Sequence, residues 1–554
     1  MVKTAEALGP DRYREEIIPE LKTLLDDEDE VQLALAEELS KSTLQDQLGG
    51  AQHVPVILPH LEALLRVEDI KVRELAVKAL LLHAPALPPE AFESTLTSLV
   101  FRLASSDYFS PKSSAIELIE LVYPRASPES KAKLIEEFKK STTHKTPMVR
   151  RSAAKSLKKL PSLVDAATLP LLLEDLKVLS SDDQDSVRLL VVEDCVSFAS
   201  LLPEESKNNV IKPIVLACGN DKSWRVRYMV ASLFTQLVDS LGQQITQTEL
   251  VPIFVQLLRD TEAEVRTAAS SKVSGVSKLL ERDTVIKELL PCVRVLSADE
   301  SSSVRSSLAS DVMGLAPLFG KDGTNEHLLD IFLLLLRDET PEVRLNVIGK
   351  LDQVTQVLGL DQLSLHLLPA IIELAEDRQW RIRLSILEYI PLLAKQLGVQ
   401  FFNEKLSNLT MSWLNDCVFS VREAATVNLQ KLTESFGVEW SKEHLLPKIM
   451  EQLKHKNYLY RTTTLTMISA IATGFPPSDI QQHFLPPIFT LLGDPIANIR
   501  LNAAKALAAL IARLETPCVQ EVVIPFLKKR LEAEADRDVV YFSNLALQTA
   551  SKRT

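Results

Sequence analysis

The chain has 554 residues, a formal net charge of −12 and a sequence pI of about 5.5. This acidic balance argues against a general nucleic-acid binder or a protein that binds anionic membranes, although a local basic patch is compatible with it. A composition with 46% hydrophobic residues, 25% charged residues and only 15 glycines is typical of helices. No apolar run approaches the ~18 residues of a membrane span, and the N-terminal segment lacks the apolar core of a secretory signal.

The cysteines indicate the compartment. They are far apart and include no C-x-x-C pair, which favours reduced thiols over a disulfide framework or a zinc site. The five are Cys195, Cys218, Cys292, Cys417 and Cys518. We therefore expect an intracellular protein of the cytoplasm and nucleus, without a metal or cofactor.

A period of 39 residues organises the chain. Arginine recurs at this step at Arg188, Arg227, Arg266, Arg305, Arg344, Arg383, Arg422, Arg461 and Arg500. Eight of these nine arginines have an aspartate six positions earlier, from Asp182 to Asp494, and only His455 interrupts the series. A fixed period of this length predicts a solenoid of stacked helical hairpins, whose surface serves binding.

The same phase extends toward both ends of the chain. It passes through Arg150, Lys112, Arg73 and Gln32 in one direction and reaches Val540 in the other, while residues 1–9 have the pattern of the tail of a preceding helix. We therefore predict one all-α, right-handed superhelical solenoid (a horseshoe) over residues 1–554. It has about fourteen repeats of ~39 residues, each with two antiparallel helices.

One repeat, residues 248–280, illustrates the pattern. Its first helix has an apolar stripe at helical spacing, the segment RDTEAE makes the turn, and a second helix has its own apolar face. Pro252 falls in the first turn of the first helix, where a missing N–H costs least. Equivalent prolines follow the period at Pro213, Pro291, Pro369, Pro447, Pro486 and Pro525. We expect them to set the same bend in each first helix.

Two interpretations of the periodic arginine are open. The aspartate is placed to cap the second helix or to accept bonds from the turn backbone, and the arginine reaches the aspartate of its own or the adjacent repeat. A ladder of such contacts fixes the stacking register, which is the favoured interpretation. The alternative is direct contact of the arginine with a partner.

No constellation of residues predicts an active site. The chain has no Walker loop, no G-x-G-x-x-G, no H-E-x-x-H and no G-x-S-x-G. The nine histidines are scattered, and the acidic runs at Asp26–Glu30 and Ser180–Asp185 are interpreted as solvated turns rather than docking sites. We predict that the protein is not an enzyme.

The turns between the two helices of each repeat predict a binding ridge. Trp224 and Trp380 occupy equivalent places, three residues before the periodic arginine, and each precedes a second arginine, Arg225 or Arg381. An exposed tryptophan beside an arginine is typical of an interface anchor, although each ring packing on the next turn is an alternative. Trp413 and Trp440 lie at helical positions and are expected to pack in the core or at a helix end. Further ridge residues are Phe419 and Tyr458 toward the C-terminus and Tyr108, Phe109, Pro147, Met148, Arg150 and Arg151 toward the N-terminus.

Several segments carry a family resemblance. SWRVRYMVA, WRIRL, PLLAKQLGVQFFNEKL, VREAATVNL, DPIANIR and VYPR closely resemble, in order and over essentially the whole chain, the HEAT-repeat scaffold (A, 65-kDa regulatory) subunit of protein phosphatase 2A. The resemblance implies a non-catalytic scaffold that assembles a Ser/Thr phosphatase holoenzyme. Its partners are the catalytic subunit, which makes a dimer core, and an exchangeable regulatory B subunit, which completes a trimer.

The resemblance also assigns residues to each partner. Residues 360–554 are expected to bind the catalytic subunit through Trp380, Arg381, Phe419, Tyr458 and Val539. Residues 10–320 are expected to bind the regulatory subunit through Asp107, Tyr108, Phe109, Pro147, Met148, Arg150, Arg151, Ser223, Trp224 and Arg225. The chain departs from the family in two ways: the first repeat is missing apart from a helix remnant, and His144–Lys145 replaces an acidic turn. The alternative function is a karyopherin-like nuclear transport receptor, which the regular steps of 38 to 41 residues disfavour.

Overall fold

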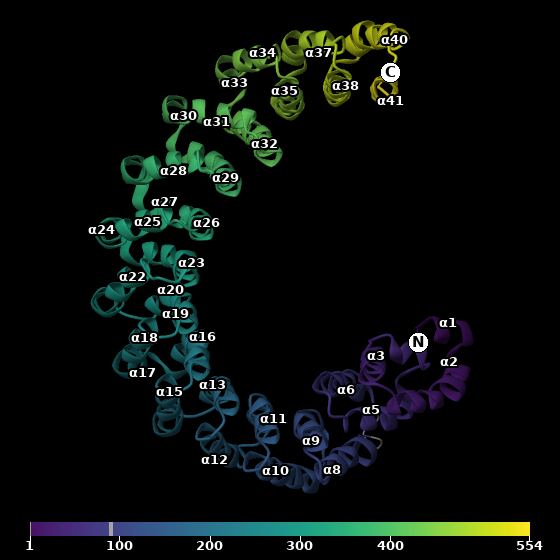
Figure 1. The fold of residues 1–554 in the computed structure, drawn as a ribbon, viewed down its shortest axis with the longest axis vertical. Helices are drawn as coiled ribbons and strands as arrows, with labels where there is room; N and C mark the ends of the chain where they lie inside the picture. Colours follow the sequence, from purple (N-terminus) through teal and green to yellow (C-terminus); the bar gives the residue numbers. More distant parts are fainter. Residues whose placement is uncertain (1, 88–91, 554) are drawn as a thin grey trace. The chain divides into compact units, whose positions relative to one another are not determined.

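The computed structural model of the protein describes residues 2–87 and 92–553, and within these ranges it contains helices and turns but no strand. The chain divides into two compact units, Met1–Asp311 and Val312–Thr554. Within each unit, helical hairpins follow one another in chain order (Figure 1). The all-helical repeat fold predicted from the 39-residue period is confirmed, whereas the horseshoe course and the exact number of repeats stay predictions.

The second helices of unit 1 form a continuous row. Each contacts the next in sequence, because the apolar face of one hairpin is buried only against its neighbour. These helices are α3 (Asp29–Leu39), α6 (Ile70–His83), α9 (Phe109–Val122), α11 (Pro147–Leu157), α13 (Asp185–Ala199), α16 (Trp224–Leu241), α19 (Ala263–Ser270) with α20 (Val273–Ser277), and α23 (Ser302–Asp311).

The first helices of unit 1 and its connections make the second layer. They are α1 (Val2–Leu8), α2 (Pro10–Arg12), η1 (Tyr13–Ile17), η2 (Pro19–Asp26), α4 (Leu44–Gln47), η3 (Ala51–Ile57), α5 (Leu58–Leu64), η4 (Ala84–Ala86), η5 (Phe92–Thr97), α8 (Ser98–Ala104), η6 (Tyr123–Arg125), α10 (Pro128–Thr142), η7 (Leu160–Ser162), α12 (Leu169–Ser180), α14 (Glu204–Ser206), η8 (Lys207–Ile211), α15 (Lys212–Gly219), α17 (Gln243–Ile245), η9 (Thr246–Leu250), α18 (Val251–Leu258), α21 (Arg282–Thr284), η10 (Val285–Leu289) and α22 (Leu290–Leu296).

Unit 2 repeats this plan. Its second helices are α26 (Pro341–Ile348), α29 (Trp380–Leu397), α32 (Phe419–Phe436), α35 (Tyr458–Ile471), α38 (Ala497–Ile511) and α41 (Arg537–Ser551), and each contacts the next. The other elements are η11 (Val312–Leu315), α24 (Ala316–His327), α25 (Leu329–Leu336), α27 (Leu351–Gln362), η12 (Leu363–Leu367), α28 (Leu368–Ala375), α30 (Val399–Lys405), α31 (Ser407–Ser412), η13 (Trp413–Asn415), α33 (Val438–His444), α34 (Leu446–Gln452), η14 (Ala472–Gly474), α36 (Pro477–Asp479), η15 (Ile480–Phe484), α37 (Leu485–Leu491), α39 (Thr516–Cys518), η16 (Val519–Val523) and α40 (Ile524–Glu532).

The periodic prolines mark a local change of helix type. In six first helices a π-helical turn ends just before a new α-helical segment that carries the proline in its first turn. In the repeat of residues 248–280, η9 ends at Leu250 and α18 carries Pro252. A proline has no N–H to donate to the preceding turn, so a π-bulge is one way to carry the helix past it. The periodic prolines therefore coincide with a local change of helix type in these six helices, and an equal bend in each first helix stays a prediction.

The periodic arginines form the predicted ladder between adjacent repeats. Arg227 places Nε 2.6 Å and Nη2 2.8 Å from the carboxylate of Asp260 in the next repeat. Its Nη1 donates to the carbonyl of Asp221, at 2.7 Å, in the turn of its own repeat. The other pairs are Arg150–Asp182, Arg188–Asp221 and Arg266–Asp299 in unit 1 and Arg344–Asp377, Arg383–Asp416, Arg461–Asp494 and Arg500–Glu534 in unit 2.

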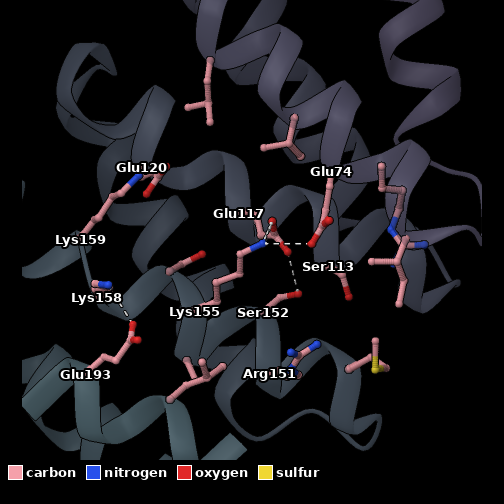
Figure 2. Close-up of a pocket in the computed structure, with 18 of the residues that line it drawn as sticks. Glu74, Ser113, Glu117, Glu120, Arg151, Ser152, Lys155, Lys158, Lys159 and Glu193 are labelled. Atoms are coloured by element: carbon pink, nitrogen blue, oxygen red, sulfur yellow. Dashed lines mark hydrogen bonds and ion pairs between the residues drawn. The ribbon is translucent and has the colours of Figure 1, made fainter. Parts of the chain in front are cut away.

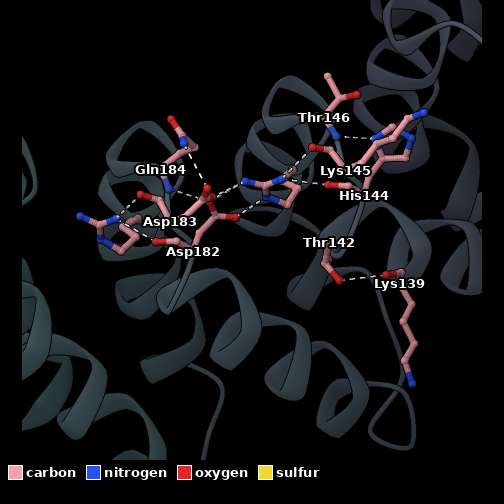
Figure 3. A network of polar contacts seen from close by, with 10 residues as sticks. Lys139, Thr142, His144, Lys145, Thr146, Asp182, Asp183 and Gln184 are labelled. Atoms are coloured by element: carbon pink, nitrogen blue, oxygen red, sulfur yellow. Dashed lines mark hydrogen bonds and ion pairs between the residues drawn. The ribbon is translucent and has the colours of Figure 1, made fainter.

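Each ladder aspartate also closes its own turn. The carboxylate of Asp260 accepts the backbone N–H of Glu262 at 3.0 Å, and Figure 3 shows Asp182 in the same arrangement with Gln184. Burial alone raises the pKa of Asp260, but the hydrogen bond from Arg227 and the turn N–H outweigh burial and hold that pKa below its ordinary value. Both predicted roles of the aspartate, in the ladder and in the turn, are confirmed.

Candidate partner-binding ridge

The predicted ridge residues lie at the start of the second helices. Trp224 is the first residue of α16 and Trp380 the first residue of α29, and Phe419 and Tyr458 begin α32 and α35. The ladder holds the starts of α16, α29 and α35 against the next repeat in their unit. Residues at this position therefore line a ridge that is fixed by the fold in each unit.

The two tryptophan–arginine pairs have the same geometry. The guanidinium of Arg225 lies 4.9 Å from the ring centroid of Trp224, and that of Arg381 lies 4.7 Å from the ring centroid of Trp380. Both rings are half-buried, whereas both arginines are exposed. A cation over an indole face forms a preorganised, partly apolar anchor. The rings are thus neither fully exposed nor fully packed on the next turn.

In unit 1, neighbouring side chains support the Trp224 pair. Tyr228 meets the indole edge-on with ring centroids 6.4 Å apart. The hydroxyl of Ser223 donates to Asp185 at 2.8 Å, and the guanidinium of Arg225 lies 3.7 Å from the same carboxylate. Asp185 therefore connects the ridge position of one repeat with the start of the second helix of the repeat before it.

The remaining ridge positions of unit 2 are unequal. Phe419 is 65% exposed and Tyr458 is 40% exposed. Val539 is only 2% exposed, because it packs inward from the first turn of α41 while its N–H donates to Asp536. The exposed aromatic side chain on this helix is Tyr541. The resemblance placed Val539 at a partner surface, but its side chain is buried, so this residue does not lie on the exposed face of the turn.

The N-terminal ridge positions also divide into exposed and structural residues. Asp107, Tyr108, Phe109 and Arg151 are exposed, with 75% of Tyr108 accessible, and Pro147 and Met148 are half-buried. Arg150, by contrast, is a member of the ladder, and only 13% of its side chain is exposed. The structure thus gives Arg150 a role in stacking, while its neighbours Met148 and Arg151 are open to a partner.

The two tryptophans expected in the core or at a helix end lie in the core. Trp413 is 2% exposed and donates from Nε1 to the carbonyl of Ala375 at 3.1 Å. Trp440 is 6% exposed and donates to Asn403 at 2.9 Å. Each indole N–H has an acceptor, as buried tryptophans require.

A charged groove in unit 1 was not predicted from the sequence. It has a volume of about 570 Å³, is formed by α6, α9, α11 and α13, and includes the predicted ridge residues Met148 and Arg151 in its lining. Figure 2 shows Lys155, Lys158 and Lys159 facing acidic side chains of neighbouring helices. The ammonium groups lie 2.9 Å from Glu117, 2.9 Å from Glu193 and 3.0 Å from Glu120, respectively. The signal in the sequence is the near-39-residue step between Glu117 and Lys155 and between Glu120 and Lys159.

One acidic side chain lining this groove is unusual. Asp194 is 1% exposed, and neither of its carboxylate oxygens has a hydrogen-bond partner. Desolvation raises the pKa of Asp194 well above its ordinary value, and the neighbouring charge of Glu193 acts in the same direction. The groove therefore contains a carboxyl group that favours its neutral form.

Other classes of site are not found in the part of the chain that the structure describes. Residues 2–87 and 92–553 contain no group of three or more His, Cys, Asp or Glu side chains arranged to hold a metal ion. The same ranges contain no helix both long and apolar enough to cross a membrane. The five cysteines are unpaired, and Cys417 is the exposed one.

The fold and its repeats define the class. Residues 243–320 match a family model described as PPP2R1A-like HEAT repeat, residues 330–514 match one for the PIK3R4-like middle domain, and residues 125–273 match one for the EF3 N-terminal HEAT repeat. The protein is an all-helical HEAT-repeat protein.

Curated relatives narrow the class. The chain is 43% identical over 253 residues to the regulatory A subunit of protein phosphatase PP2A from Schizosaccharomyces pombe. This match covers 44% of this chain and 42% of that protein. It is 47% identical over 154 residues to the protein phosphatase 2A scaffold subunit of Dictyostelium discoideum, and the match covers 28% of this chain and 26% of that protein. It is 44% identical over 153 residues to the beta isoform of the human 65 kDa regulatory A subunit, and the match covers 28% of this chain and 25% of that protein. The resemblance to the regulatory A subunits of protein phosphatase 2A is confirmed, over less than half the length of each relative.

Solved structures share the backbone arrangement. Importin beta aligns with a TM-score of 0.57 at 13% identity over 99% of this chain and 74% of that one. Kap95p in complex with RanGDP aligns with a TM-score of 0.58 at 11% identity, over 97% of this chain and 72% of that chain. At such identities the likeness concerns the fold alone.

Proposed function

We propose that the protein is a non-catalytic scaffold that holds a regulatory B subunit together with a Ser/Thr phosphatase catalytic subunit on one chain. The observation that carries the proposal is the pair of tryptophan–arginine anchors, Trp224–Arg225 and Trp380–Arg381, at equivalent ridge positions of two units in a chain related to the A subunits. Relatives named as regulatory or scaffold subunits support the absence of catalysis.

The mechanism of the proposed scaffold is effective concentration. Two partners bound to one chain meet as if at high concentration and need little affinity for each other. Rigid ladders suit this role, because a partner that binds a preorganised ridge loses less free energy in ordering it. The phosphatase chemistry belongs to the catalytic subunit, and the isolated chain is expected to release no phosphate from a phosphopeptide above the rate in buffer.

Unit 2 is proposed to bind the catalytic subunit. Its ridge offers Trp380 and Arg381, then Phe419 and Tyr458, as exposed or half-exposed aromatic and cationic groups at successive repeats. Aromatic and arginine side chains are the residues that most often dominate interface energetics. At the α41 turn, we propose contact through exposed side chains such as Tyr541 instead of Val539.

Unit 1 is proposed to bind the regulatory subunit. The exposed residues of its ridge are Tyr108, Phe109, Arg151 and Arg225, with Met148 and Trp224 half-buried among them. The carboxylate of Asp185 lies close to both Ser223 and Arg225 and limits their motion. The groove behind Met148 and Arg151 adds alternating charges, which favour specificity over raw affinity.

The test uses two double variants that serve as controls for each other. Trp380→Ala with Arg381→Ala is expected to reduce affinity for purified catalytic subunit by at least about a hundredfold, since two anchors are lost. Trp224→Ala with Arg225→Ala is expected to reduce regulatory-subunit binding and leave catalytic-subunit binding unchanged. Leu334→Ala, which truncates a side chain that is 50% exposed on α25, provides a control away from the ridge. Unchanged affinity of the Trp380/Arg381 variant for the catalytic subunit would refute the assignment of unit 2.

The karyopherin-like alternative is supported only at the level of fold. The solved structures named above share 11% and 13% identity with this chain, whereas relatives named as PP2A regulatory or scaffold subunits share 38% to 47% over their matched segments. A binding assay with the small GTPase of nuclear transport separates the two functions, and we expect no complex.

A further inference from the structure

One rung of the ladder lacks its carboxylate. In unit 2, Arg383 pairs with Asp416 and Arg461 pairs with Asp494, but between them Arg422 has His455 at the place of the aspartate. The exception to the 39-residue pattern is therefore a change in contacts and not only in sequence.

The guanidinium of Arg422 is nevertheless held in the ladder position. Its Nη1 donates to the carbonyl of Asp416 at 2.7 Å, the same contact that Arg383 makes with Asp377 at 2.7 Å. In Arg383 this contact leaves Nε and Nη2 pointing at a carboxylate, 2.7 and 2.8 Å away. In Arg422 the Nε is buried without an acceptor. The same is true of Arg344 and Arg461, but each of those brings Nη2 to an aspartate of the next repeat, at 3.1 and 3.2 Å, whereas Arg422 has no such ion pair with any described residue. The Nε/Nη2 edge of the held Arg422 guanidinium is therefore without a carboxylate, and we call it the empty edge.

His455 does not fill the gap. Its Nδ1 accepts the backbone N–H of Asn457 at 3.0 Å, which is the turn-closing role of the missing aspartate. Its ring packs on Tyr460, with centroids 4.4 Å apart. His144 in unit 1 does the same, since its Nδ1 accepts the N–H of Thr146 at 3.1 Å. A histidine at this place closes the turn but brings no negative charge to the preceding repeat.

The turn that carries His455 is cationic and open. Lys454, His455 and Lys456 are all exposed, and with Pro447, Met450 and Glu451 they line a surface hollow of about 720 Å³. Glu451 is the one acidic side chain in this lining. On the other side, Phe419 is 65% exposed, and its ring centroid lies 5.7 Å from the guanidinium of Arg422. In a chain with a net charge of −12, this is a local site for negative charge.

We propose that Arg422 receives an aspartate or glutamate side chain of the protein that binds the ridge of unit 2, which completes the rung in trans. A carboxylate matches the fork of Arg422 because the neighbouring rungs use that pairing, and bidentate arginine–carboxylate contacts are both strong and directional. An unpaired buried donor is costly, so a partner that supplies the acceptor gains the free energy that the free chain lacks. The exposed Phe419 and Tyr458 lie at the starts of the two helices that flank this rung and seat the apolar part of the same contact. The proposal rests on the proposed function, which makes that partner the phosphatase catalytic subunit.

The experiment compares affinity and stability in three full-length variants, and its probe is purified catalytic subunit. Arg422→Gln removes the charge and is expected to weaken binding about tenfold or more. His455→Asp supplies the carboxylate within the chain, so it is expected to raise the melting temperature of the free chain and to weaken binding to a similar extent. His144→Asp makes the same change of charge in unit 1 and is expected to leave this affinity unchanged.

Three results overturn the proposal. His455→Asp that binds as tightly as the wild type, or more tightly, means that the partner does not use the empty edge. Equal weakening by His455→Asp and His144→Asp means that overall charge, and not this rung, controls affinity. A melting temperature of the free chain that does not rise in His455→Asp means that the fork was not vacant. Failure of the proposed function looks different, because the wild-type chain then binds no catalytic subunit.

Discussion

The ladder makes a quantitative prediction at the Arg227–Asp260 rung. Replacing Asp260 with alanine removes two charge-assisted hydrogen bonds, at 2.6 and 2.8 Å, and the acceptor that closes the turn at Glu262. It leaves the guanidinium of Arg227, of which 13% is exposed, with only the carbonyl contacts of its own turn.

The expected cost follows from burial. Removing one partner of a fully buried ion pair costs about 3–5 kcal/mol, and an exposed pair contributes about 0–1 kcal/mol. The carboxylate side chain of Asp260 is 5% exposed and Arg227 is slightly open to water, so we expect a loss of about 2–3 kcal/mol. At ~2–4 °C per kcal/mol for a unit of this size, the melting temperature falls by about 5–10 °C.

The assay is a double-mutant cycle of Arg227→Ala, Asp260→Ala and the double variant, followed by urea unfolding and hydrogen exchange. The cycle isolates the pair, and we expect a coupling free energy above about 1 kcal/mol. Hydrogen exchange is expected to increase at the junction of α16 and α19 first, because repeat arrays open locally. Asp239→Ala, which removes an exposed carboxylate of α16, is the control and is expected to cost less than about 0.5 kcal/mol. A coupling free energy near zero would refute the claim that the ladder fixes the stacking register.

Three further predictions follow from buried groups. Burial raises the pKa of Asp175 to about 6, so this group contributes stability below pH ~4 that is lost as the pH rises through 6. In urea titrations, the free energy of unfolding of Asp175→Asn relative to that of the wild type is expected to be higher at pH 7 than at pH 4.5. An equal difference in this free energy at both pH values would contradict the prediction. Trp440→Ala removes a ring that packs edge-on against Phe402 and Phe436, and calorimetry is expected to record a loss of about 3–5 kcal/mol; a loss below 1 kcal/mol would count against this packing. Titration of native thiols with a disulfide reagent is expected to modify Cys417 quickly and the four buried cysteines only on unfolding, because burial raises the pKa of the thiols of Cys195, Cys218, Cys292 and Cys518; a second fast thiol would show that one of these sites opens.

The fold was predictable because the same weak sequence pattern recurs in every repeat. The constant Arg–Asp spacing was enough to predict a ladder of ion pairs. The apolar positions of residues 248–280 are buried as expected. The sequence left open whether the arginine reaches the aspartate of its own repeat or of the next one. The structure resolves this by packing: the carboxylate comes from the next repeat, and the arginine's own turn supplies a carbonyl.

The site was less predictable because exposure depends on neighbours in space. Val539 was assigned to a partner surface by the resemblance, but it lies one position before the periodic site, as Val226, Val421 and Ile499 do, and like them it is buried. Arg150 lies among ridge residues in the sequence, but its guanidinium forms an ion pair with Asp182 of the next repeat and so belongs to the ladder. The groove lined by Lys155 and Glu117 needs two helices from different repeats, so no local motif signals it. Which partner occupies which turn is a property of two surfaces, and one sequence contains only one of them.

The central claim is that one chain holds two partners at the same time on different units. Native mass spectrometry of the purified chain, mixed with a regulatory B subunit plus a phosphatase catalytic subunit, tests it directly. We expect a ternary complex with one copy of each, reduced to the complex of chain and regulatory subunit when Trp380 and Arg381 are both replaced by alanine. A mixture of two separate binary complexes, in which each partner displaces the other, would contradict it.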